Sequence, residues 1–140
     1  MLAPPAAEPK SLSVRHSGCL QIFEYLRRRL RSFGHAFRGG RTLVATQPNA
    51  RVHAVATLAV TALGIALRID RSEWVALAFA MALVWFAEAL NTAVELLADE
   101  VTLERRERIG QAKDVAAFGV LAAAVGAAAV GLLVFAPRLL

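Results

Sequence analysis

The chain has 140 residues, of which 57% are hydrophobic, and its mean hydropathy is +0.51. A soluble domain of this length could not bury so much apolar surface, so the composition excludes an ordinary soluble protein and indicates an integral membrane protein. The net charge is +5, but nine of the 16 Lys and Arg residues lie in residues 1–51 and four more in 105–113. Basic residues grouped beside apolar stretches are typical of the cytoplasmic flanks of membrane spans, which argues against a nucleic-acid partner.

The N-terminal region divides into two segments. Residues 1–19 are rich in Pro, Ala and Ser and have no apolar periodicity, so we expect a disordered tail. Over about residues 20–38, apolar and aromatic side chains recur at helical spacing with arginines between them. A basic amphipathic helix with aromatic residues on its apolar face is typical of a helix that lies on a membrane surface. The sequence therefore predicts a surface helix over this segment.

Three apolar stretches follow, over about residues 52–67, 74–97 and 115–136. About twenty helical residues cross the hydrocarbon core of a bilayer, so each stretch is predicted to be a transmembrane helix. Pro137 is expected to end the third helix. The expected fold class is an all-α membrane protein with a surface helix and three transmembrane helices, in which residues 20–140 form a single integral-membrane domain.

The placement of basic residues also predicts the topology. The N-terminal region and the 98–114 segment are expected in the cytoplasm, and the short turn over residues 68–73 then faces outward with the C-terminus. The third span is rich in Gly and Ala, which allow helix backbones to approach closely. Since three helices alone would leave polar groups facing lipid, we expect a homo-oligomer.

The second span carries an uncommon stripe of polar residues. Glu88, Asn91, Glu95 and Asp99 are three, four and four residues apart and share one helix face, with Thr92 beside them. Ionisable residues at membrane depth are costly and mark functional sites. Carboxylate and amide oxygens suit Mg²⁺, and a glutamate removed from water can serve as a general base. The stripe therefore predicts a metal ligand and a base in one site, with an interhelical hydrogen-bond clamp as the structural alternative.

The segment after the second span carries a cluster of cations: Arg105, Arg106, Arg108 and Lys113. Alone, such a cluster is typical of a solvated cytoplasmic loop. Beside a metal-binding stripe it is a candidate phosphate clamp, because cations bind phosphate oxygens and Gly110 permits a close backbone approach.

Motifs of the common nucleotide-binding folds are absent. The spacing of Gly34 and Gly39 resembles the start of a P-loop, but Gly40 stands where the motif needs lysine. Two rival functions remain on this ground. A small oligomer that translocates ions or protons would also use membrane carboxylates, and a non-enzymatic assembly protein would use them only for packing.

The residues resemble the prokaryotic diacylglycerol kinase family, which includes undecaprenol kinases. The resemblance rests on the run Glu88-Ala-Leu-Asn-Thr-Ala-Val-Glu95 followed by Asp99, on Gly110-Gln-Ala-Lys-Asp114, and on the Pro48–His53 entry to the first span. It covers about residues 20–136. It implies a membrane lipid kinase that uses ATP and Mg²⁺, assembled as a homotrimer in the bacterial inner membrane, with active sites at the boundary between membrane and cytoplasm.

The resemblance also implies roles for individual residues. Glu88 would be the catalytic base for the lipid hydroxyl, Glu95 would bind the metal, and Asn91 would orient the centre. Contacts to the nucleotide are implied for a further set, of which the last two are the weaker candidates: Lys113, Asp114, Glu104 and Arg28.

Two positions depart from the family pattern. Gln47 stands where the family often has a second metal-binding glutamate, so the site carries one negative charge less, although the amide oxygen can still bind Mg²⁺. His35 stands where some relatives have an aromatic residue near the nucleotide, and its ring can still stack. The acceptor lipid is left open between diacylglycerol and undecaprenol. Asn49, Arg51 and His53 together are more similar to the undecaprenol type.

Overall fold

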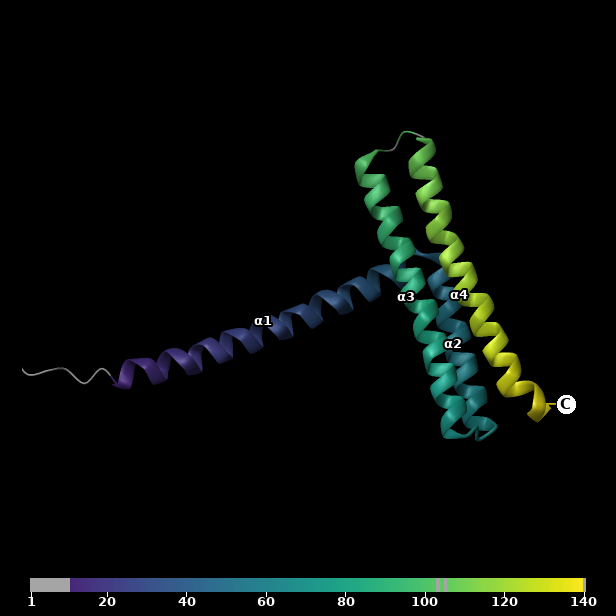
Figure 1. Cartoon of the computed structure of the whole chain (residues 1–140), viewed down its shortest axis with the longest axis horizontal. Coiled ribbons are helices and arrows are strands. Elements are labelled where there is room, and N and C mark those ends of the chain that lie inside the picture. The colour runs from purple at the N-terminus through teal and green to yellow at the C-terminus, as the bar shows by residue number, and fades with distance from the viewer. Residues whose placement is uncertain (1–10, 103, 105, 140) are drawn as a thin grey trace, which may run out of the picture. The chain divides into compact units, whose positions relative to one another are not determined.

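The computed structural model describes residues 11–102, 104 and 106–139, with the backbone alone given for residues 11–20. All regular structure in these ranges is helical, which confirms the predicted fold class (Figure 1). The helices are α1 (Ser11–Thr46), α2 (Pro48–Ala66), α3 (Arg71–Val101) and α4 (Glu107–Leu139). The chain forms two units, Met1–Gly39 and Gly40–Leu140, which are described separately.

Helix α1 is longer than the surface helix predicted over residues 20–38, because it begins at Ser11 and ends at Thr46. Gly34, Gly39 and Gly40 do not interrupt it, since an isolated glycine costs a helix only about 1 kcal/mol relative to alanine. Of the predicted disordered tail, residues 11–19 are helical and residues 1–10 lie outside the described residues.

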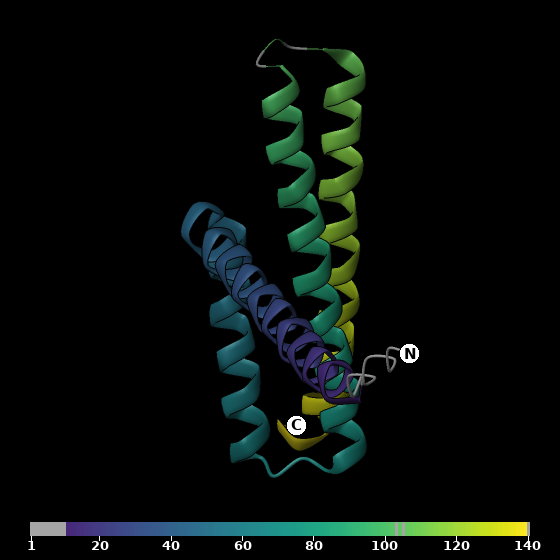
Figure 2. The ribbon, with the colours of Figure 1, turned by 90° about the vertical axis from the view of Figure 1, so that its left-hand side faces the viewer.

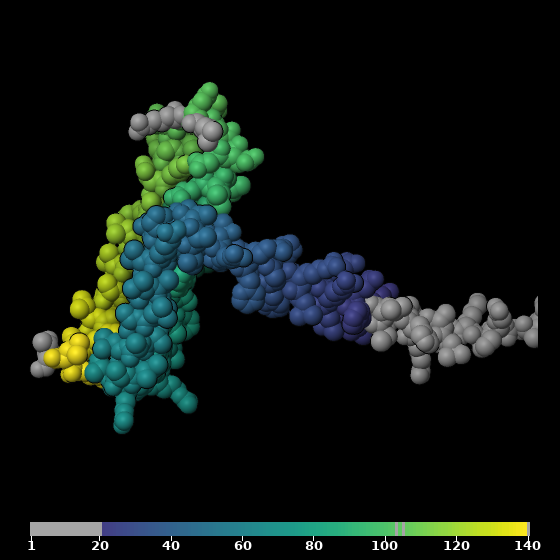
Figure 3. All heavy atoms as spheres, turned by 180° about the vertical axis from the view of Figure 1, so that it is seen from behind, coloured from purple at the N-terminus to yellow at the C-terminus, as the bar shows by residue number. Residues whose placement is uncertain are grey.

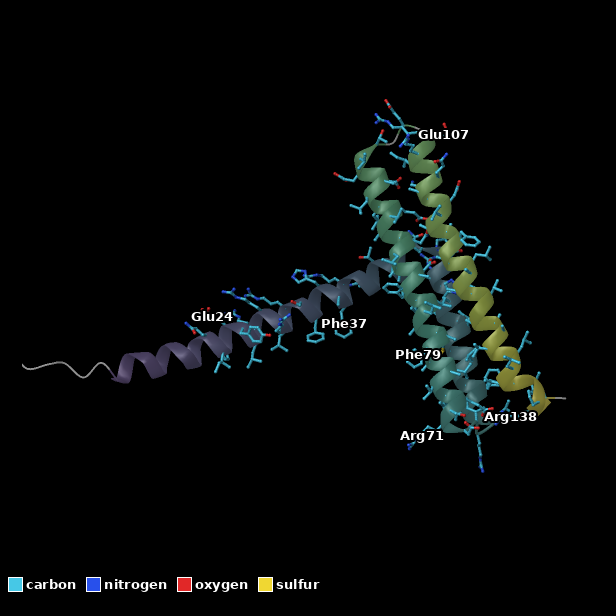
Figure 4. The ribbon with its side chains drawn as sticks, viewed as in Figure 1. Glu24, Phe37, Arg71, Phe79, Glu107 and Arg138 are labelled. Atoms are coloured by element: carbon cyan, nitrogen blue, oxygen red, sulfur yellow. The ribbon has the colours of Figure 1, made fainter. Side chains whose placement is uncertain are left out.

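The N-terminal unit is amphipathic. Phe23, Leu26, Leu30, Phe33 and Phe37 recur at spacings of three and four and are all exposed. Figure 4 shows nitrogen-bearing side chains gathered on one side of α1 and rings, Phe37 among them, on the other. An exposed apolar stripe beside a row of arginines fits the predicted attachment to a membrane surface.

Helices α2, α3 and α4 are each long and apolar enough to cross a membrane, which confirms the three predicted spans. Each helix extends beyond the predicted apolar stretch. Pro137 does not end α4, which continues to Leu139, because a proline in a last turn removes only one hydrogen bond of the helix. At 1.5 Å per residue, α3 and α4 are longer than a hydrocarbon core of about 30 Å, so their ends protrude from it.

The packing of the second unit is centred on α3, which α4 follows for most of its length and which α2 contacts on another side (Figures 1 and 2). In the view from behind, α2 lies in front of this pair (Figure 3). A hydrophobic cluster lies at the end where α2 turns into α3. Its buried residues are Ile69, Leu77, Val134 and Phe135.

The turn between α2 and α3 is closed by backbone and side-chain hydrogen bonds. Arg68 has φ 49°, and the Ile69 N–H donates to the Gly64 carbonyl at 3.2 Å, so α2 ends in a left-handed residue followed by a wrapped-back amide. Asp70 then caps α3, accepting from the backbone N–H groups of Ser72 and Glu73. Only about four residues therefore separate the two antiparallel helices, which agrees with the short turn predicted between these spans.

Candidate active site

The polar stripe of the second span is buried on α3. Glu88, Asn91 and Thr92 are exposed by only 1%, 5% and 5%, and they are the buried polar residues of the described chain. The Asn91 side-chain amide donates to Glu95 Oε1 at 2.9 Å, so these two side chains are held together one turn apart.

Three buried oxygen atoms of this stripe have no hydrogen-bond partner in the described part of the chain: Glu88 Oε2, Asn91 Oδ1 and Thr92 Oγ1. Leaving a buried polar group unpaired costs about 1–3 kcal/mol, and more for a charge. Such groups persist where a substrate, water or neighbouring chain completes them. Three together on one helix face therefore make this stripe the candidate site of the chain.

His53 lies opposite Glu88, on α2. Its Nε2 is 4.0 Å from Glu88 Oε2, and its side chain is 16% exposed. Sequence reasoning used His53 only as a hint of substrate type and missed this contact. One signal was available, because His53 is the one ionisable residue of the 52–67 stretch.

An apolar groove of about 740 Å³ begins at His53 and runs between α2, α3 and α4. On α3 its lining residues are Leu77, Ala80, Met81 and Val84, and Glu88 is the next residue on that face. On α4 the lining residues range from Ala124 to Leu139, all apolar. The groove is therefore lined by hydrocarbon, and its lining residue His53 lies 4.0 Å from the buried Glu88 carboxylate. Of its lining residues only His53 and Thr57 are polar.

The ends of α3 and α4 beyond Glu95 hold the predicted nucleotide contacts. Lys113 Nζ lies 2.5 Å from Asp99 Oδ1, joining the two helices, and Asp114 is exposed beside it. Glu104 pairs with Arg106 at 3.5 Å. Arg105, of the predicted phosphate clamp, lies outside the described residues.

The 98–114 segment is mostly helical and not a loop. Helix α3 continues to Val101 and α4 begins at Glu107, which places Gly110 and Lys113 in the first turns of α4. The Lys113–Asp99 pair joins the two helices beyond the apolar stretch.

The oxygen donors near Glu95 have the chemistry that Mg²⁺ prefers. Asn91 Oδ1 is unpaired, and the Glu95 carboxylate uses only one oxygen for Asn91. Gln47 lies apart in sequence, at the residue that precedes α2. Among the described residues no group of three or more His, Cys, Asp and Glu side chains is arranged around a common point. This donor set fits a cation that keeps water and phosphate ligands, as Mg²⁺ does in nucleotide sites.

Arg28 and His35 belong to the N-terminal unit. Arg28 lies 3.8 Å from Glu24, and His35 Nδ1 lies 2.7 Å from an Arg38 guanidinium nitrogen. Their predicted contacts with a nucleotide stay predictions.

Comparison with known proteins gives one family and several relatives. Residues 34–135 match the model of the family described as prokaryotic diacylglycerol kinase. The chain is 35% identical over 114 residues to undecaprenol kinase of Bacillus subtilis, covering 81% of this chain and 93% of that protein. It is 33% identical over 140 residues to diacylglycerol kinase of Synechocystis, covering 99% and 78%, and 30% identical over 96 residues to that of Escherichia coli K12, covering 69% and 79%.

Proposed function

This chain belongs to the prokaryotic diacylglycerol kinase family and is thereby a lipid kinase, and on that premise we propose that it transfers the γ-phosphate of ATP, with Mg²⁺, to the hydroxyl of a long-chain membrane alcohol. The observation that carries the proposal is a carboxylate, Glu88, that is 1% exposed, has an unpaired oxygen and lies 4.0 Å from His53, which lines an apolar groove. A lipid alcohol has the matching chemistry, with one hydroxyl on a long hydrocarbon.

Glu88 is the proposed catalytic base. It would accept the proton of the lipid hydroxyl while that oxygen bonds to the γ-phosphorus and the bond to the bridging oxygen of ADP breaks. Phosphoryl transfer depends mainly on positioning and charge stabilisation, so few protein groups are needed.

The remaining groups are proposed to hold the nucleotide. Glu95 and Gln47 would supply oxygen ligands to Mg²⁺, which neutralises phosphate charge when it is bound, and Asn91 would orient the centre. Lys113 would exchange its present partner Asp99 for a phosphate oxygen, and Asp114 would contact the nucleotide beside it. Glu104, Arg28 and His35 are proposed as outer contacts to the nucleotide.

Undecaprenol is the acceptor that we favour over diacylglycerol. Asn49, Arg51 and His53 are similar to the undecaprenol type, and the relative named undecaprenol kinase matches over 93% of its length. The enzyme would act as a homotrimer in the bacterial inner membrane, with its N-terminus and the 98–114 segment in the cytoplasm. A second hollow on α3 and α4 supports close contact between copies. Half of its lining residues are small, namely Ala87, Ala116, Gly119, Ala122 and Ala123, and Asn91 and larger apolar side chains complete it.

The test is transfer of radiolabelled phosphate from ATP by the purified protein in mixed micelles, with undecaprenol, diacylglycerol and ceramide offered separately. We expect phosphorylated lipid only with Mg²⁺, and most with undecaprenol. Glu88→Gln should abolish it, whereas the matched change Glu100→Gln, at an exposed residue of the same helix, should not. A wild-type protein that phosphorylates none of these alcohols would refute the proposal and leave ion translocation or a structural role.

A further inference from the structure

His53 is the ionisable side chain among the groove-lining residues, and it faces Glu88. The distance of 4.0 Å between His53 Nε2 and Glu88 Oε2 is too long for a direct hydrogen bond. One oxygen atom can nevertheless lie about 2.8 Å from both atoms, subtending an angle of about 90° between them, which an sp³ hydroxyl oxygen accommodates. The pair is therefore spaced to hold one hydroxyl group.

The neighbouring polar groups are already engaged. Thr57, one turn further along the groove, accepts a hydrogen bond from Trp85 Nε1 at 3.1 Å. The Arg51 guanidinium donates to the carbonyls of Val44 and Ala45.

The carboxylates that follow Glu88 on α3 also have partners. On α3, Glu95 is bonded to Asn91, and Asp99 is paired with Lys113 of α4. Among the described residues, His53 is thus the one basic group within ion-pair range of Glu88.

We propose that His53 is a second residue of the acceptor site, which donates a hydrogen bond from Nε2 to the lipid oxygen while Glu88 accepts the proton of that same hydroxyl. This inference rests on the proposed function. The His53 N–H would orient the oxygen so that its free lone pair faces the phosphorus. In the step itself the O–H bond breaks toward Glu88, the new O–P bond forms, and ADP leaves with the electron pair of the broken bond. The His53 proton stays on nitrogen throughout.

The variants His53→Leu and His53→Gln separate the hydrogen bond from the volume of the ring. Leucine fills the space without a donor, and glutamine returns an N–H near the position of Nε2. We expect His53→Leu to raise the KM for the lipid about tenfold or more, since one hydrogen bond to substrate is lost, while the KM for ATP stays within about twofold. His53→Gln should restore most of the lipid KM, and Val55→Ala, on the exposed face of α2, should match the wild type.

The results for the His53 variants can be told apart from a failure of the proposed kinase function. If the wild type phosphorylates lipid and His53→Leu retains the wild-type lipid KM and kcat, the inference about His53 is wrong while the kinase assignment stands. The inference is equally wrong if glutamine is no better than leucine.

A measurement on the wild type covers the case in which His53→Leu does not fold. In protein labelled with ¹⁵N histidine, undecaprenol should shift the Nε2 resonance of His53, and the corresponding hydrocarbon, which has no oxygen to accept the hydrogen bond, should shift it much less. Equal shifts with the alcohol and the hydrocarbon, or none with either, would contradict the proposal.

Discussion

Two regions of the α2–α3–α4 bundle, the turn between α2 and α3 and the surroundings of Glu88, treat their polar groups in opposite ways. At the turn between α2 and α3, Asp70 and Glu73 form a reciprocal cap, and Arg138 of α4 makes two hydrogen bonds to the Glu73 carboxylate at 2.5 and 2.7 Å. Figure 4 shows Arg138 at this end and Glu107 at the other. Around Glu88, by contrast, three buried oxygens have no partner within the described chain. The polar groups of the turn are thus satisfied within the chain, whereas those around Glu88 are not.

The largest effect is expected from the substitution Glu88→Met. The change removes the base and with it the acceleration of about 10²–10⁴-fold that a positioned base contributes. It also removes a buried carboxylate whose second oxygen is unpaired, so unfolding should need equal or higher temperature. Phosphate transfer and thermal unfolding in detergent measure the two effects. A variant that loses stability along with activity would indicate a structural clamp instead.

A steric change at the turn should cost stability without touching the chemistry. A Cβ atom at Gly64 would lie 2.9 Å from Cη2 of Trp74 and 3.1 Å from Cδ1 of Ile69. Overpacking of a core typically costs about 1–3 kcal/mol, so Gly64→Ala should lower the free energy of unfolding by that amount. Gly126→Ala is the matched control, because nothing lies within 4 Å of its added methyl group in the single chain. Titration with SDS compares them, and equal stability of the two variants would argue against tight packing at the turn.

Much of this contrast could be predicted from the sequence, but not its geometry. Apolar stretches of sufficient length fixed three spans, and a spacing of three and four placed Glu88, Asn91 and Glu95 on one face. Helix ends were placed less well, because Asp99 and Lys113 stabilise helix beyond the apolar stretch through a contact between residues 14 apart. The pairing of His53 with Glu88 depends on how α2 rotates against α3, which no local pattern reports.

The Arg138–Glu73 pair gives a smaller effect at the turn. Both side chains are partly exposed, at 30% and 20%, and the two-pronged geometry favours arginine over lysine. Arg138→Lys should therefore cost about 1 kcal/mol of unfolding free energy and leave phosphate transfer unchanged. A double-mutant cycle with Glu73→Gln measures the coupling. Coupling near zero would show that arginine interacts with Glu73 no better than lysine does.

The smallest expected effect is a dependence of stability on pH that arises from Asp70. Hydrogen bonds from the Ser72 hydroxyl and the Glu73 backbone N–H hold the pKa of the Asp70 carboxyl below its ordinary value. Because the folded pKa is the lower one, the carboxylate contributes its stability at pH values above the ordinary pKa of 3.8, and this contribution is lost as the pH falls through the folded pKa.

Asp70→Asn keeps an oxygen that can cap α3 but cannot titrate. The wild type should therefore be more stable than Asp70→Asn at pH 7, and the difference should shrink as acid is added to about pH 3, measured by thermal unfolding in detergent. Since the turn lies far along α3 from Glu88, phosphate transfer at pH 7 should be the same for both proteins, and a loss of activity in Asp70→Asn would mean that the two regions are coupled.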